Sequence, residues 1–258
     1  MNGVIFVPSK KSSGYTLTST LLKGYRKAAV DNSRELQYEA ALLLANNHYS
    51  RAHFLAAASI EEIGKAVQAF DALGRNVRDS EVSTRVRLNF QDYSKKMAAA
   101  VFPWLLRDTN SREEVSSFIE YLVDFKNSSE PSIFVGIEPQ GMEIHTPFAV
   151  VQREAAERCV RMARTIFSYA APHVLDGHYK VRTRAEDDFF VMKPSAVLGI
   201  SGGADFWQYY IACMKSGDAA FEAALMDYTK KYLAKNEKYK LEDMGSTENI
   251  HMGPLHVS

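Results

Sequence analysis

The sequence contains few of the residues that mark disulfide-rich, zinc-binding or membrane-embedded proteins. Only two of its 258 residues are cysteines, Cys159 and Cys213, and they form no CxxC pair. This excludes a disulfide framework and a cysteine-based zinc site, and it is typical of a protein in a reducing cytoplasm. No apolar run approaches the roughly 18 residues that a membrane-spanning helix requires, so we expect no membrane partner.

Motifs that hold cofactors or metal ions are also missing. Walker A, HExxH, GxSxG and the Glu-x-x-His of di-iron bundles do not occur in the sequence. We therefore expect no metal site and no cofactor, and any enzymatic chemistry would have to rely on side chains alone.

The chain has no excess of charge of either sign. It contains 31 basic and 31 acidic residues, so its formal net charge is zero, and contact with RNA would have to use a local basic patch. The first residues lack the basic and long apolar regions of a signal peptide. We expect residues 1–15 to be a flexible leader and the polar residues 236–258 to be a mobile tail.

Helical periodicity dominates what is present. Apolar residues recur at spacings of three and four, which predicts four helices before residue 130, a long helix over 148–175 and two C-terminal helices. Ser50 is the expected N-cap of the second helix and Gly74 its C′ residue. The predicted helices lie at about 17–46, 51–73, 80–106, 111–126, 148–175, 205–214 and 218–233.

The segment 131–146 has a different pattern from the helices around it. Ile133, Val135 and Ile137 alternate ahead of a "PQG" turn signal, which predicts a short β-hairpin or a loop insertion. Helical patterns lie on both sides of this segment, so we expect one all-α domain over residues 16–235. A helical core would occupy residues 16–130, and residues 147–235 would add further helices.

The stretch "LAAASIEEIGKA" places two glutamates, a glycine and a lysine inside an alanine-rich helix. On a helical wheel Glu62 falls in an alanine-lined seam at the edge of the core, and Glu61 falls on the outer side. Gly64 costs about 1 kcal/mol relative to alanine, so either another backbone approaches there or the cost is tolerated. One interpretation is a solvated Glu61–Lys65 pair; the other is a buried polar cluster that contains Glu62.

Arginines form a basic stripe on the predicted long helix. Arg153, Arg161 and Arg164 fall on one face of it, where they could contact the phosphates of RNA. The alternative is a solvated face that Glu154 and Glu157 partly balance.

The stretch "AALLLANNHYSRAHFLAAASIEEIGKA" resembles the helical hairpin that ends in EExGK in the AbiV family of bacterial abortive-infection proteins. Downstream, "FQDYSKK" lies where the family has an F-x-x-H-x-x-K element, with Tyr93 at the position of the histidine. "YLVDFKNSSEP" is similar to the family's YVDF-type segment. The resemblance covers about residues 21–131.

The resemblance implies an all-α, HEPN-like bundle that dimerises and acts in phage defence by shutting down growth or protein synthesis. The Arg-x4-6-His motif of HEPN ribonucleases does not occur in this sequence. The residues that the family pattern marks as a catalytic or structural polar cluster are Glu61, Glu62, Lys65, Tyr93, Lys96 and Asp124.

Three functions are consistent with these features. The first is a cytoplasmic effector that binds a phage or host component and blocks translation. The second is an atypical ribonuclease in which Glu61 or Glu62 is the general base, Lys65 and Lys96 stabilise phosphate charge and Tyr93 positions the substrate. The third is a small-molecule or nucleotide sensor with its ligand in a helical cleft. Whether the protein is an enzyme is left open.

Overall fold

The computed structural model describes residues 15–235, except 109, 128–131, 139–142 and 218–219. Apart from Tyr15, the predicted leader and the predicted tail lie outside the described residues. The fold is all-α with one small hairpin, as predicted. None of the helices in the described part of the chain is long and apolar enough to cross a bilayer.

Contacts divide the chain into two compact units, residues 1–181 and 182–258. Each unit is described separately below, and the single domain expected over residues 16–235 stays a prediction. The helices of the first unit are α1 (Ser19–Ala45), α2 (Tyr49–Ala72), α3 (Ser80–Gln91), α4 (Tyr93–Leu105), α5 (Arg112–Asn127), α6 (Pro147–Val150) and α7 (Arg153–Leu175).

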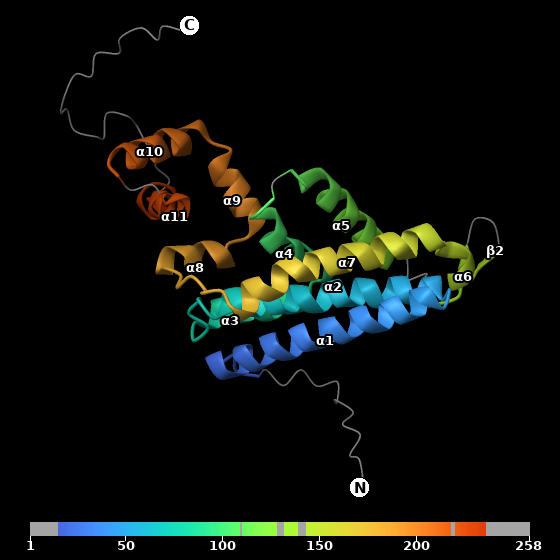
Figure 1. Cartoon of the computed structure of the whole chain (residues 1–258). Helices are drawn as coiled ribbons and strands as arrows, with labels where there is room; N and C mark the ends of the chain where they lie inside the picture. Colours follow the sequence, from blue (N-terminus) through green and yellow to red (C-terminus); the bar gives the residue numbers. More distant parts are fainter. Residues whose placement is uncertain (1–14, 109, 128–131, 139–142, 218–219, 236–258) are drawn as a thin grey trace, which may run out of the picture. The chain divides into compact units, whose positions relative to one another are not determined.

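Helix α2 is the centre of the first unit. It packs against α1, α4 and α7, and the long helices α1, α2 and α7 run side by side (Figure 1). Half of its 24 residues are buried, because it has neighbours on three sides. Ile60, Ile63 and Phe70 of α2 join Met97 of α4 and Ile166 of α7 in one apolar core.

The connection between α1 and α2 is a tight turn. Asn47 adopts a left-handed backbone conformation (φ 62°), which asparagine tolerates better than most residues. Helix α2 begins at Tyr49 with His48 at the N-cap and no side-chain cap, so the predicted cap at Ser50 is wrong. At the other end, Gly74 follows the C-cap residue Leu73 and occupies the predicted C′ position.

The helix predicted over residues 80–106 is two helices, α3 and α4. Asp92 lies between them with an extended backbone, and its carboxylate accepts the backbone N–H of Lys95 at 3.0 Å. Aspartate is better placed at an N-cap than inside a helix, so this cap favours a break over one continuous helix. Pro103 lies within α4, which ends two residues later.

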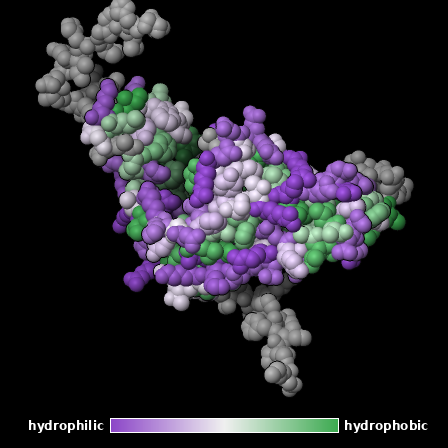
Figure 2. Space-filling view, in the orientation of Figure 1, coloured by the Kyte–Doolittle hydropathy of each residue, from purple (hydrophilic) through white to green (hydrophobic). Residues whose placement is uncertain are grey.

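The predicted hairpin forms from β1 (Gly136–Glu138) and β2 (Glu143–His145), which pair antiparallel. Ile137 lies opposite Ile144, and both side chains are exposed, as are Phe134 and Phe148. Figure 2 shows hydrophobic side chains gathered at this end of the first unit.

The second unit is a small helical unit with an aromatic core. Its helices are α8 (Arg184–Val191), α9 (Pro194–Ser201), α10 (Ala204–Lys215) and α11 (Phe221–Lys231), followed by the 3₁₀ turn η1 (Leu233–Lys235). Periodicity predicted α10 and α11 but not the two eight-residue helices before them. The buried residues at its centre are Phe206, Tyr209, Ala224, Leu225 and Tyr228.

Candidate functional site

The EEIGK segment lies where α2 crosses α4, and Gly64 permits the close approach of the two helices. A methyl group at Gly64 would lie 2.7 Å from the carbonyl carbon of Lys96. The position must therefore be glycine for a steric reason, because the α4 backbone occupies the space of a side chain. Of the two explanations for Gly64, the approach of another backbone is the observed one.

The close crossing brings opposite charges together. The ammonium of Lys96 on α4 donates to Glu61 Oε1 at 2.5 Å, and Lys65 donates to Glu62 Oε1 at 2.6 Å. Lys65 also lies 3.6 Å from Glu61. Glu61 therefore links two helices and two lysines, and we call Glu61, Glu62, Lys65 and Lys96 the charge cluster.

The helical wheel misassigned Glu61, whereas the partial burial of Glu62 agrees with its expected place at the edge of the core. Glu61 is 21% exposed and Glu62 is 20% exposed, so neither is the surface residue and neither is more enclosed than the other. The wheel assumes one buried face, whereas α2 is packed on three sides. Glu61, which was expected to point outward, is the carboxylate that reaches another helix.

Burial and charge act in opposite directions on Lys65. Burial lowers the pKa of its ammonium, but the hydrogen bond to Glu62 and the charges of Glu62 and Glu61 outweigh burial and raise it. Lys65 therefore stays charged at neutral pH and neutralises the two carboxylates. Tyr25 of α1 lies close enough to sense these charges, and burial is the main reason why its pKa is raised.

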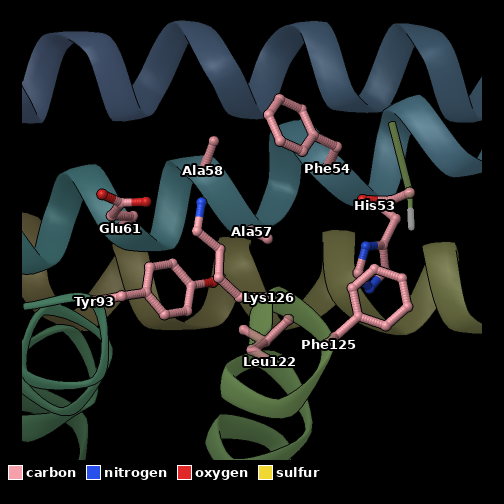
Figure 3. Close-up of a pocket in the computed structure, with 10 residues that line it drawn as sticks. His53, Phe54, Ala57, Ala58, Glu61, Tyr93, Leu122, Phe125 and Lys126 are labelled. Atoms are coloured by element: carbon pink, nitrogen blue, oxygen red, sulfur yellow. The ribbon is translucent and has the colours of Figure 1, made fainter. Parts of the chain in front are cut away.

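Beside the charge cluster, residues of α2, α4 and α5, together with Ser132, line a partly open cavity of about 60 Å³ (Figure 3). Glu61 and Tyr93 line one end, and Lys126 of α5 extends across it toward α2. Burial and the neighbouring Glu61 charge raise the pKa of Tyr93, so its hydroxyl is neutral at physiological pH. At about 30 Å³ for each water molecule, this cavity has room for only about two. Drug-sized ligands occupy pockets of about 300–1,000 Å³, so the cavity is too small for one.

His53 lines the other end of the cavity and was not predicted as a site residue. Its side chain is buried, its Nε2 lies 3.0 Å from the Tyr121 hydroxyl, and its Nδ1 has no hydrogen-bond partner among the described residues. Burial lowers the pKa of His53 to about 4, so the ring is neutral at pH 7.

His53 precedes Glu61 by eight residues, or about 12 Å along the helix axis, so the two cannot act on one reacting atom. On a helical wheel of 100° per residue with Glu62 at zero, the apolar residues Ile60, Ile63, Val67 and Phe70 fall between about 80° and 160°, and His53 falls at about 180°, beside them. That signal was available in the sequence.

Five of the six predicted cluster residues come together, though not as one pocket. Tyr93 adjoins Glu61 at the cavity, whereas Glu62, Lys65 and Lys96 do not line it. The sixth, Asp124, is exposed on α5 and does not line the cavity either.

The predicted arginine stripe lines a second depression, which the sequence did not reveal. Arg153, Arg161 and Arg164 of α7 face the C-terminal part of α1 across a groove of about 380 Å³. Glu157 pairs with Arg153 at 2.8 Å and lies 3.9 Å from Arg161. We call this depression the arginine groove. The residues that complete its walls are Ala41, Leu44, Ala45, Asn47 and Val160.

The described residues contain no group of three histidine, cysteine or acidic side chains arranged to hold a metal ion. Searches against curated proteins and against solved structures found no match. The model of the AbiV family matches residues 21–168, which is more than half of the chain. The match extends past the segment of resemblance noted in the sequence and takes in the hairpin and most of α7. With this match and an all-α fold built around the EEIGK helix, the chain belongs to the AbiV family.

Proposed function

We propose that the protein is an anti-phage effector that acts by binding, and that it blocks phage propagation by shutting down translation in the infected cell. Membership of the AbiV family indicates the abortive-infection role. The mode of action is our inference from the site.

The observation that carries this proposal is the pairing of the charge cluster. A general base needs a carboxylate that can accept a proton from the substrate, but each glutamate already accepts from a lysine at 2.5–2.6 Å. The adjoining cavity of about 60 Å³ is too small for a nucleotide. These features favour a cluster that holds α2 against α4, and they give least support to a nucleotide sensor.

The second candidate is the atypical ribonuclease. Glu61, Tyr93 and Lys126 line one cavity and supply a carboxylate, a hydroxyl and a cation. Such groups can move a proton and stabilise phosphate charge, although a cavity of about 60 Å³ would have to widen before it could admit a nucleotide.

Cell-free translation tests the first candidate. We expect purified protein, supplied with lysate of phage-infected cells, to reduce reporter synthesis while ribosomal, transfer and messenger RNA stay intact on a denaturing gel. Mock-infected lysate is the control. Undiminished synthesis under both conditions would contradict the proposal.

A matched pair of variants separates the two candidates. Glu61→Gln changes a carboxylate that lines the cavity, whereas Glu62→Gln changes one that does not. If the protein is a ribonuclease, total RNA is cleaved by wild type and Glu62→Gln but not by Glu61→Gln. If it acts by binding, none of the three cleaves RNA, and Glu61→Gln instead lowers the unfolding temperature because Lys96 then faces a neutral amide in place of a carboxylate.

A further inference from the structure

The arginine groove lies between α1 and α7, away from the charge cluster, and its guanidinium groups are exposed to solvent, where a ligand can contact them. Arg164 makes no ion pair with any described residue, and the side chains of Arg153 and Arg161 are 65% and 68% exposed. The carboxylate of Glu157 is shared between the last two, so the groove keeps a net positive charge. Arg158, on the same helix, instead lies over the Phe118 ring and takes no part.

The spacing of the arginines suits a chain of anions better than a single anion. Arg153 and Arg161 are about 12 Å apart along the helix, and Arg164 is about 4.5 Å further on. One small anion can be reached by two of these side chains, as the Glu157 carboxylate is by Arg153 and Arg161, but the three arginines together span about 16.5 Å along the helix axis. A ligand with negative charges repeated along its length can contact all three, and each guanidinium fork can bind a phosphate through two hydrogen bonds.

The groove walls indicate which polyanion fits. Packed helices lie about 8–10 Å apart from axis to axis, so the groove is a narrow channel over their line of contact, which suits a single nucleic-acid strand better than a duplex. The half-buried apolar side chain of Leu44 on the wall suits the face of a base or sugar, whereas Val160 is buried. An acidic peptide fits less well, because the backbone amides of α1 and α7 are used within the helices and cannot pair with a peptide backbone.

We infer that the arginine groove binds the phosphate backbone of single-stranded nucleic acid through Arg153, Arg161 and Arg164. This inference rests on the proposed function, since a strand held there gives a translation inhibitor a means to engage RNA. DNA shares the same backbone chemistry, so the binding experiment includes both.

Fluorescence anisotropy with a labelled 12-nucleotide oligouridylate, and with oligothymidylate of the same length, tests the assignment. We expect Arg161→Ala/Arg164→Ala to weaken binding by about tenfold or more. The slope of log affinity against log salt should fall by about 1.4, because each phosphate contact on a single strand contributes about 0.7. The matched control is Arg184→Ala/Lys230→Ala in the second unit, which removes two exposed cations whose nearest carboxylate is 3.9 Å away; its affinity and slope should stay unchanged.

Three outcomes would overturn the assignment: wild type binds neither oligonucleotide, the control variant weakens binding equally, or polyglutamate of equal charge competes as well as RNA. Circular dichroism checks that both variants are folded. A failure of the proposed function is separate from these outcomes. If Arg161→Ala/Arg164→Ala loses oligonucleotide binding yet still arrests translation, the groove assignment stands and its link to translation is refuted.

Discussion

The α2–α4 contact and the arginine groove both contain basic residues and glutamate, but the charges are paired at the contact and in excess at the groove. At the contact, Gly64 lets two helices approach closely, and each glutamate finds a lysine within hydrogen-bonding distance. At the groove, the carboxylate of Glu157 pairs with Arg153 and lies near Arg161, and Arg164 makes no ion pair with any described residue. Charges paired across a close helix contact are suited to holding a bundle together, whereas charges left in excess on an open surface are suited to binding a ligand.

The largest effect we expect is at the close contact itself. Gly64→Ala should lower the free energy of unfolding by more than about 3 kcal/mol, because the added methyl group overlaps the Lys96 backbone, which cannot move without shifting α4. Gly24→Ala is the control, since nothing lies within 4 Å of a methyl group there. It should stabilise the protein by about 0.5–1 kcal/mol through helix propensity. Urea denaturation of both variants measures the difference, and similar stabilities would show that the α2–α4 contact is not close.

His53 gives the next largest effect, because it is a buried polar residue of α2 without a charged partner. Burial lowers its pKa from 6.5 to about 4, so the folded state favours the neutral ring. The resulting stability is present above pH 6.5 and is lost as the pH falls toward 4. Between about pH 7.5 and pH 4.5, wild type should lose about 2–3 kcal/mol more than His53→Gln. Urea titrations at several pH values measure this, and parallel pH profiles would show that His53 is not buried as described.

The third effect separates an enclosed lysine from an exposed neighbour. Lys96→Met leaves Glu61 without its interhelical partner and should cost about 2 kcal/mol, because the Lys96 side chain is only 8% exposed. Lys95 is 45% exposed and lies 3.8 Å from Asp92, so Lys95→Met should change stability by less than about 0.5 kcal/mol. Thermal unfolding of the two variants measures the difference. Equal losses of stability would mean that the ion pair between Lys96 and Glu61 does not stabilise the bundle.

The smallest effect is expected at the groove. Arg161→Ala should alter the free energy of unfolding by less than about 0.5 kcal/mol, because the side chain is exposed and its nearest carboxylate is 3.9 Å away. Chemical denaturation is the measurement. A loss comparable to that of Lys96→Met would mean that the groove, like the α2–α4 contact, is structural.

Much of the fold could be predicted because helices and hairpins are specified locally. Periodicity located α1, α2 and α5 to within two residues, and alternation located the hairpin. For the long helix it gave the end of α7 correctly, but the predicted start at residue 148 is wrong, because residues 147–150 form the separate short helix α6 and α7 begins at Arg153. The errors have local causes as well: Asp92 caps a new helix inside a continuous apolar pattern, and the eight-residue helices α8 and α9 are too short for a clear period. The site was less predictable, because a wheel for one helix shows which face is buried but not which neighbour covers it.

By itself, the sequence determined the all-α class, the hairpin, the AbiV family and the face of α7 that carries the arginines. Only the tertiary structure decided that Glu61 pairs with Lys96, that Gly64 accommodates the α4 backbone, that His53 faces a small cavity and that α1 completes the arginine groove. The physical reason is that local patterns depend on residues three or four positions apart. Pairing, exclusion of water and cavity volume instead depend on how helices far apart in the sequence cross.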